Sequence, residues 1–152
     1  MPLNIVLITP EIPNNTGNIG RLALASGSKL HLVKPLGFEI DDNRLKRAGL
    51  DYWKHLSVTY YESIDAFFEI NKNEQMVFLS SHGKKKHWEI PFNENLFLIF
   101  GKESAGLPKS IINTHLNNLY KIPLYSTHVR SLNLANAVSI TVYEGLRQLN
   151  ID

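Results

Sequence analysis

The chain has 152 residues, of which 43% are hydrophobic, 20% charged and 10% aromatic, and its formal net charge at pH 7 is +2. This length fits one domain over residues 1–152, and the apolar fraction excludes an intrinsically disordered chain. The sequence contains no cysteine, which excludes disulfides, thiolate metal sites and cysteine nucleophiles.

The predicted elements alternate between short apolar strands and helices along the chain. Strands are expected at residues 4–9, 30–34, 58–61, 76–80, 96–100 and 119–122. Helices are expected at residues 17–26, 42–50, 63–71, 108–115 and 132–149. In the first helix, Asn14, Asn15 and Thr16 are expected to act as capping residues, with Gly27 ending the helix. A polar loop is expected between the fourth and fifth strands.

Neither a membrane span nor a secretory leader is predicted. The most apolar uncharged stretch, residues 131–143, is shorter than the ~18 residues that a transmembrane helix needs. The first residues also lack the basic region and small-residue cleavage site of a secretory signal. We therefore expect a cytoplasmic protein.

This alternation predicts an α/β fold, with a mostly parallel sheet covered by helices on both faces. Such sheets bind ligands beyond the carboxyl ends of their strands. Polar clusters follow four of the predicted strands there, at residues 10–21, 80–87, 101–108 and 123–133. The sequence therefore predicts a binding site at this edge of the sheet.

Three common enzyme sites are disfavoured by their spacing. Gly17 and Gly20 match only two glycines of a dinucleotide fingerprint, and the second strand ends at Lys34 where an acidic residue would be expected. The segment around Ser104 has two residues between glycine and serine, whereas a hydrolase elbow has one. The six histidines show no metal-ligand spacing, so no metal site is predicted.

Basic residues beside aromatic residues favour RNA as a partner. Arg44, Lys46, Arg47 and Lys54 surround the predicted second helix near Tyr52 and Trp53, and Lys84 to Lys86 lie next to Trp88. Such pairs hold RNA phosphates and stack on unpaired bases. In the first loop, Arg21 is placed in the first helical turn, where a cation opposes the helix dipole, so a phosphate or a developing oxyanion is the expected partner.

Three segments together resemble the signature motifs of the SPOUT-class RNA 2′-O-methyltransferases. They run from Pro13 to Arg21, from Phe100 to Pro108, and from Ile122 to Ala137. The segment from Gly37 to Tyr52 is similar to the minimal subgroup that methylates the wobble ribose of tRNA, at cytidine or uridine. The resemblance covers about residues 3–149.

The resemblance implies a C-terminal deep trefoil knot, S-adenosylmethionine as cofactor, an obligate homodimer, and the tRNA anticodon stem-loop as substrate. The implied cofactor-binding residues are Leu79, Ser80, Gly101, Ile122, Ser131 and Leu132. The implied catalytic residues are Arg21, Asn15, Glu103, Ser131 and Asn133. For RNA binding we expect Arg44, Lys46, Arg47 and Arg130.

The implied reaction needs no metal and no covalent intermediate. An arginine guanidinium keeps its proton in proteins, so we expect Arg21 to donate hydrogen bonds to the nascent alkoxide or to a nearby phosphate. Ser131 and Asn133 are expected to hold the cofactor and the start of the last helix, and Glu103 to order Arg21 or to accept from a ligand hydroxyl.

Three alternatives remain open from the sequence. The enzyme could methylate a ribose at another tRNA or rRNA position. The chain could bind RNA without transferring a methyl group. It could also be a small-molecule nucleotide enzyme of flavodoxin-like fold, which predicts no salt-sensitive tRNA binding.

Overall fold

The computed structural model describes residues 3–39 and 52–150. The predicted helix at residues 42–50, together with Arg44, Lys46 and Arg47, lies outside the described residues. Among the described residues, no helix is both long and apolar enough to cross a membrane.

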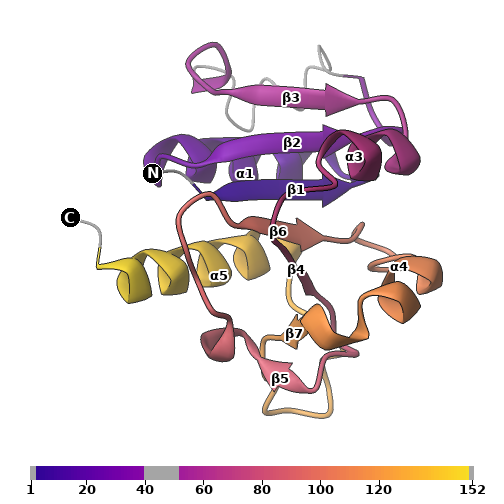
Figure 1. The fold of residues 1–152 in the computed structure, drawn as a ribbon, viewed down its shortest axis with the longest axis vertical. Helices are drawn as coiled ribbons and strands as arrows, with labels where there is room; N and C mark the ends of the chain where they lie inside the picture. The colour runs from indigo at the N-terminus through magenta and orange to yellow at the C-terminus, as the bar shows by residue number, and fades with distance from the viewer. Residues whose placement is uncertain (1–2, 40–51, 151–152) are drawn as a thin grey trace.

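The described strands form one sheet in which every pair of adjacent strands is parallel, as the alternation of strands and helices predicted (Figure 1). Its order is β3-β2-β1-β6-β4-β7-β5. The strands are β1 (Asn4–Ile8), β2 (Lys29–Val33), β3 (Val58–Tyr61), β4 (Met76–Leu79), β5 (Lys85–Lys86), β6 (Phe97–Phe100) and β7 (Leu119–Lys121). Strand β5 was not predicted, because its two exposed lysines carry no apolar signal; the segment was expected to be a polar loop.

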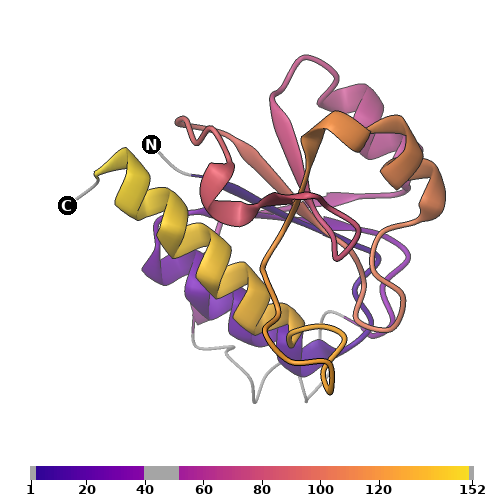
Figure 2. The ribbon, with the colours of Figure 1, turned by 90° about the horizontal axis from the view of Figure 1, so that it is seen from below.

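Helices cover both faces of the sheet. They are α1 (Pro13–Ala25), α3 (Ile64–Ile70), α4 (Lys109–Thr114) and α5 (Leu134–Leu149), with short 3₁₀ turns η1 (His87–Glu89) and η2 (Leu116–Asn118). Helices α1 and α5 lie side by side on one face, and α3 and α4 lie on the other (Figure 2). This arrangement confirms the predicted layers.

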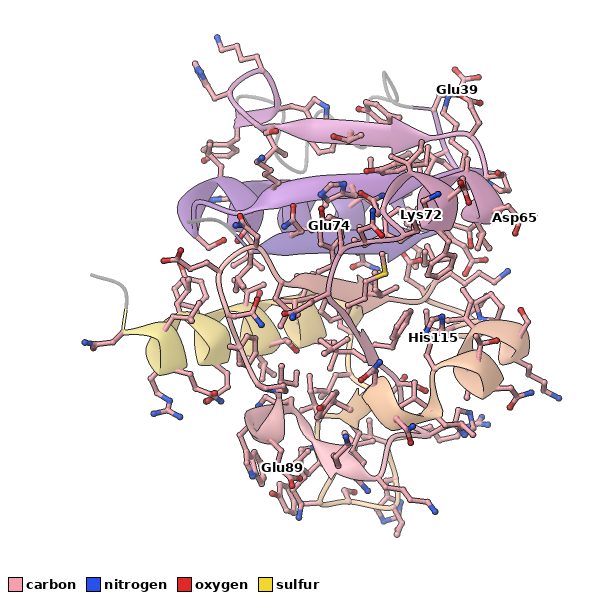
Figure 3. The ribbon with its side chains drawn as sticks, viewed as in Figure 1. Glu39, Asp65, Lys72, Glu74, Glu89 and His115 are labelled. Carbon is pink, nitrogen blue, oxygen red and sulfur yellow. The ribbon has the colours of Figure 1, made fainter. Side chains whose placement is uncertain are left out.

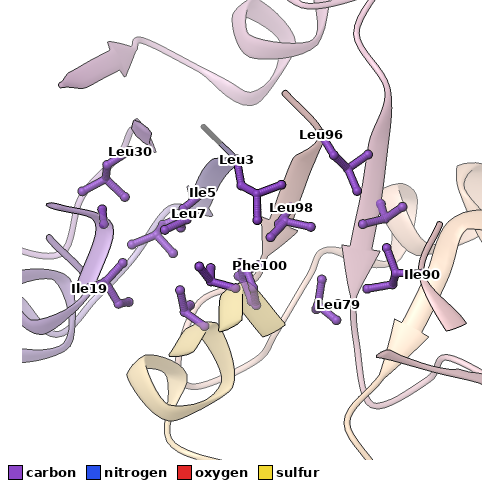
Figure 4. Close-up of a cluster of buried hydrophobic side chains, with 14 of the residues drawn as sticks. Leu3, Ile5, Leu7, Ile19, Leu30, Leu79, Ile90, Leu96, Leu98 and Phe100 are labelled. Atoms are coloured by element: carbon purple, nitrogen blue, oxygen red, sulfur yellow. The ribbon is translucent and has the colours of Figure 1, made fainter. Parts of the chain in front are cut away.

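The two faces bury two separate hydrophobic clusters. Successive side chains of a strand point to opposite faces, so Ile5 and Leu7 join the cluster under α1 and α5 (Figure 4). Val6 and Ile8 join the second cluster, to which α3 contributes Phe67. Strand β1 is therefore buried on both sides, which explains why its sequence is a continuous apolar run.

Helix α1 begins four residues earlier than predicted, and the expected caps are wrong. Pro13 occupies the first turn, where its missing N–H costs no hydrogen bond. Asn14, Asn15 and Thr16 therefore lie inside the helix, and no side chain caps it from Ile12. The predicted end is confirmed: the helix stops at Ala25, and Gly27 has a positive φ of 67°.

The starts of helices α3 and α5 lie within two residues of their predicted positions. The Ser63 side chain accepts a hydrogen bond from the Ala66 N–H at 3.0 Å and caps α3. The Asn133 side chain accepts from the Asn136 N–H at 3.2 Å and caps α5. The expected role of Asn133 at the start of the last helix is confirmed.

Candidate active site

A cleft of about 690 Å³ lies beyond the carboxyl ends of β6, β4 and β7, which are adjacent in the sheet. Three loops supply most of its walls: residues 80–82 after β4, residues 101–107 after β6, and the segment 122–134 after β7. The cleft therefore lies at the edge where the polar clusters of the sequence meet. Its volume is in the usual range for a small-molecule site.

The predicted cofactor residues all line this cleft. Leu79 and Ile122 contribute apolar surface, and Gly101 contributes backbone. The complete set among the lining residues is Leu79, Ser80, Gly101, Ile122, Ser131 and Leu132. Arg130, predicted to contact RNA, also lines it. The combination of apolar walls with serine hydroxyls and backbone suits a ligand that has both a flat apolar part and polar ends.

The loop after β6 is folded tightly on itself. Lys102 and Gly106 form an antiparallel bridge, and the Gly106 N–H donates to the Lys102 carbonyl at 2.9 Å. A Cβ on Gly101 would lie 2.1 Å from the carbonyl carbon of Gly106, and Gly106 has a φ of 67°. Gly101 therefore requires glycine because of this close approach, and Gly106 favours glycine because of its positive φ. The turn projects residues 103–105 beyond the sheet.

Glu103 joins this loop to the start of α1. Its two carboxylate oxygens accept hydrogen bonds from the backbone N–H groups of Glu11 and Ile12, each at 2.8 Å. The Asn15 side-chain amide also donates to Glu103, at 3.2 Å. A carboxylate from a distant loop thus occupies the N-terminal end of α1, where the helix dipole favours negative charge.

Asn15 connects this end of α1 to the third loop. Its Oδ1 accepts a hydrogen bond from the Asn133 side-chain amide at 3.1 Å. Glu103, Asn15 and Asn133 consequently form one hydrogen-bonded chain that joins all three signature motifs. Asn15 is 7% exposed, so this link lies largely out of solvent.

A second contact joins the segment before α1 to the loop after β6, and it was not predicted from the sequence. The Glu11 carboxylate accepts from the Ser104 N–H at 2.9 Å and from the Ser104 hydroxyl at 2.6 Å. The hydrogen bonds from Ser104, with a smaller effect of Lys102, hold the pKa of Glu11 below its usual range. Glu11 had one sequence signal, its position directly after the first strand within a polar cluster.

Arg21 is placed differently from the other predicted catalytic residues. Because α1 begins at Pro13, Arg21 lies in the third turn, roughly 12 Å along the axis from the helix start. The predicted first-turn position is therefore wrong, and so is the helix-dipole argument based on it. Arg21 is exposed, its guanidinium lies 5.0 Å from the centre of the Tyr52 ring, and it is not among the residues that line the cleft. The Glu103 carboxylate accepts hydrogen bonds from Glu11, Ile12 and Asn15. Among the described contacts, it forms none with Arg21.

Within residues 3–39 and 52–150, no group of three His, Asp or Glu side chains could hold a metal ion. Three of the described histidines, His31, His87 and His115, lie against aromatic rings in separate parts of the fold. His115 stacks on Phe78 beside α4, with ring centres 4.2 Å apart (Figure 3). Burial lowers the pKa of His115 and of His87, so both rings favour the neutral state.

The SpoU rRNA methylase family matches residues 2–143. The chain belongs to this family. Among SpoU relatives, the tRNA (cytidine(34)-2′-O)-methyltransferase of Saccharophagus degradans is 48% identical over 147 residues, covering 96% of this chain and 95% of the relative. The match therefore spans nearly the whole of both chains.

Solved structures agree with this assignment. One described as "Structural insights into the 2-OH methylation of C/U34 on tRNA" has a TM-score of 0.92 and 44% identity, covering 97% of this chain and 96% of that one. The SpoU methyltransferase AviRb of Streptomyces viridochromogenes, solved in complex with AdoMet, has a TM-score of 0.87 at 24% identity. The match covers 98% of this chain and 61% of the AviRb chain, and the two chains share the fold.

Proposed function

We propose that this SpoU-family protein transfers a methyl group from S-adenosylmethionine to the ribose 2′-hydroxyl of the wobble cytidine or uridine of tRNA. The observation that carries the proposal is the 48% identity, over nearly the full length of both chains, to a relative named for this reaction. The resemblance of residues 37–52 to the wobble-specific subgroup supports the same position in tRNA.

The cleft fits the proposed cofactor. Leu79, Ile122 and Leu132 offer apolar surface for an adenine ring, and Ser80 and Ser131 offer hydroxyls for ribose or amino-acid groups. The tight turn at Gly101 brings backbone N–H and C=O groups to the wall of the cleft. When bound, the cofactor supplies an electrophilic methyl group on a sulfonium.

The protein's contribution to the reaction is orientation and charge stabilisation. The Glu103, Asn15 and Asn133 chain holds the three loops in one arrangement, which places bound reactants at a fixed separation. We propose that Arg21 donates hydrogen bonds to the alkoxide as it develops, or to the adjacent phosphate. The proton of the 2′-hydroxyl then passes to phosphate or water.

We further propose that the active form is a homodimer. Arg21 does not line the cleft of its own chain, so a second chain is the simplest source of the guanidinium at each cleft. Helices α1 and α5 carry exposed apolar side chains that a partner would cover: Leu24 is 36% exposed, Ile140 40% and Tyr143 49%. We also propose that the C-terminal part of the chain forms the trefoil knot that the resemblance implies.

For the RNA, we infer that Arg130 at the cleft meets the anticodon stem-loop, and that Arg44, Lys46 and Arg47 contact its backbone. Because tRNA is the proposed substrate, we propose that the protein acts in the cytoplasm. Phosphate contacts of this kind release counterions, so tRNA binding should weaken steeply as salt rises.

Nucleoside mass spectrometry on tRNA from cells with and without this gene tests the proposed function. We expect 2′-O-methylation at the wobble nucleotide to disappear in the deletion and to return when the gene is restored. Unchanged wobble methylation together with loss at another tRNA or rRNA position would move the activity to that position. Complete retention of ribose methylation alongside intact tRNA binding would favour an RNA-binding protein without transfer.

A further inference from the structure

We propose that Glu11 is a positioning residue of the cofactor site, acting through Ser104 to hold the loop at residues 101–107 in its binding shape. The inference rests on the proposed use of S-adenosylmethionine and adds a residue that neither the motifs nor the chemistry of the reaction had indicated. Glu11 itself is not among the residues that line the cleft, whereas Ser104 is.

The contact is reciprocal. Glu11 accepts two hydrogen bonds from Ser104 through a single oxygen, Oε1, at 2.9 Å from the N–H and 2.6 Å from the hydroxyl. In return, the backbone N–H of Glu11 donates to Glu103 at 2.8 Å. We call this exchange the carboxylate clasp. Each of its two acidic residues binds the backbone of the loop that carries the other.

The tip of the loop depends on this clasp. Gly101 and Gly106 set the turn at its base, but Ser104 and Ala105 beyond it are exposed and have little packing of their own. Among the described residues, the hydrogen bonds that join residues 103–105 to the rest of the protein go to Glu11, Ile12 and Asn15. Removing the Glu11 carboxylate removes two of these five bonds.

Glu11 is itself held firmly on the other side. The Gly37 N–H donates to the Pro10 carbonyl at 2.9 Å, and a Cβ on Gly37 would lie 2.7 Å from the Glu11 Cα. The backbone of Glu11 is therefore held between a neighbouring loop and the end of β1, a fully buried strand. A side chain on such a fixed backbone is suited to positioning the exposed loop tip that it contacts.

Calorimetric titration of S-adenosylmethionine into purified variants tests the clasp. We expect Glu11→Ala to weaken cofactor binding by roughly tenfold, because two hydrogen bonds to a charged acceptor are lost. Glu11→Gln should stay within about threefold of wild type, because its one amide oxygen can still accept both bonds. In kinetics, the KM for the cofactor should rise in Glu11→Ala, while kcat at saturating cofactor and the KM for RNA stay close to wild type.

A double-mutant cycle separates the clasp from a direct contact of Ser104 with the cofactor. Ser104→Ala should weaken cofactor binding in the wild-type background and have almost no further effect in Glu11→Ala. Glu62→Ala is the matched control, because among the described residues its carboxylate forms an exposed ion pair with Lys34, away from the loop at residues 101–107. If Ser104→Ala weakens binding equally in both backgrounds, or if Glu11→Gln is as weak as Glu11→Ala, the clasp is not the means by which Glu11 acts.

Hydrogen exchange of the peptide that covers residues 101–107 gives a readout that needs no cofactor. We expect faster exchange in Glu11→Ala than in wild type or Glu62→Ala, at unchanged melting temperature. If exchange is faster in Glu11→Ala than in wild type but the wild-type protein does not bind S-adenosylmethionine, the proposed function is refuted and the clasp is still supported. Equal exchange in all three proteins would refute the clasp.

Discussion

At the residue scale, His31 shows how a titratable side chain is accommodated inside the sheet. It lies in β2 at 6% exposure, with Nε2 2.9 Å from Asn4 Oδ1 and Nδ1 2.8 Å from the Tyr61 hydroxyl. The Asn4 amide nitrogen already donates to the Asn95 carbonyl, so Asn4 Oδ1 is an acceptor. His31 therefore carries its proton on Nε2 and accepts from Tyr61 at Nδ1, which satisfies the neutral ring completely.

This environment predicts a loss of stability in mild acid. Burial, with a smaller effect of Lys29, lowers the pKa of His31 from 6.5 to about 4. The unfolded chain therefore binds a proton between these values while the folded chain does not. The contribution of His31 to folding is fully present above pH 6.5 and is lost as the pH falls toward 4. Between pH 7.5 and pH 5 the loss should be about 2 kcal/mol.

Urea unfolding of wild type and His31→Gln at the two pH values measures this contribution. Glutamine can replace both hydrogen bonds but does not titrate, so the difference in stability between the proteins should narrow at pH 5. His87 and His115 are present in both proteins, and their effects cancel in the comparison. A pH dependence that is identical in wild type and variant would show that His31 remains neutral in both states or protonates in both.

At the element scale, the loop after β6 joins the sheet to the cleft, and its shape depends on two glycines. Gly101→Ala places a methyl group against the backbone of Gly106 and Leu107, where no side chain can rotate away. We expect the turn to open and the affinity for S-adenosylmethionine to fall by more than about tenfold, since backbone displacement disturbs the whole loop. Calorimetry measures the change.

Gly27→Ala is the control for a general effect of replacing glycine. Gly27 also has a positive φ of 67°, but a Cβ there would meet nothing within 4 Å, and the residue lies at the end of α1 away from the cleft. Its replacement should cost about 1 kcal/mol of stability and leave cofactor affinity unchanged. Equal affinity in Gly101→Ala and Gly27→Ala would contradict the role assigned to this turn.

At the scale of the whole molecule, the separation of Arg21 from the cleft makes a prediction about assembly. Sedimentation should give a dimer, and a charge at the exposed Tyr143 of α5 should weaken it. If Arg21 serves the partner's cleft, a mixed dimer of an Arg21→Ala chain and a Gly101→Ala chain has one intact site. We expect about half of the wild-type methylation rate from such a dimer isolated with two different tags.

The parent dimers act as controls for this complementation. Arg21→Ala homodimers and Gly101→Ala homodimers should each be nearly inactive, for different reasons. An inactive mixed dimer would mean that Arg21 serves the cleft of its own chain. A stable monomer of wild-type protein at micromolar concentration would overturn the dimer proposal itself.

The sequence alone determined the layered architecture, because buried parallel strands such as β1 are apolar on both faces and Ser63 and Asn133 cap helices within three residues of themselves. These are local signals. The short edge strand β5 has none, since its lysines are exposed and its pairing depends on β7, which follows it by more than thirty residues.

Only the tertiary structure decided how the site is held together. The backbone N–H groups of Glu11 and Ile12, at the start of α1, donate to Glu103, which is 92 and 91 residues away in the sequence. Local capping rules cannot detect such a distant partner, so they placed the helix start wrongly. The same fold pairs Glu11 with Ser104 and leaves Arg21 about two turns from the start of α1, outside the lining of the cleft. Sequence patterns report which face of an element is buried, whereas partners brought together by crossovers of the chain depend on its path through space.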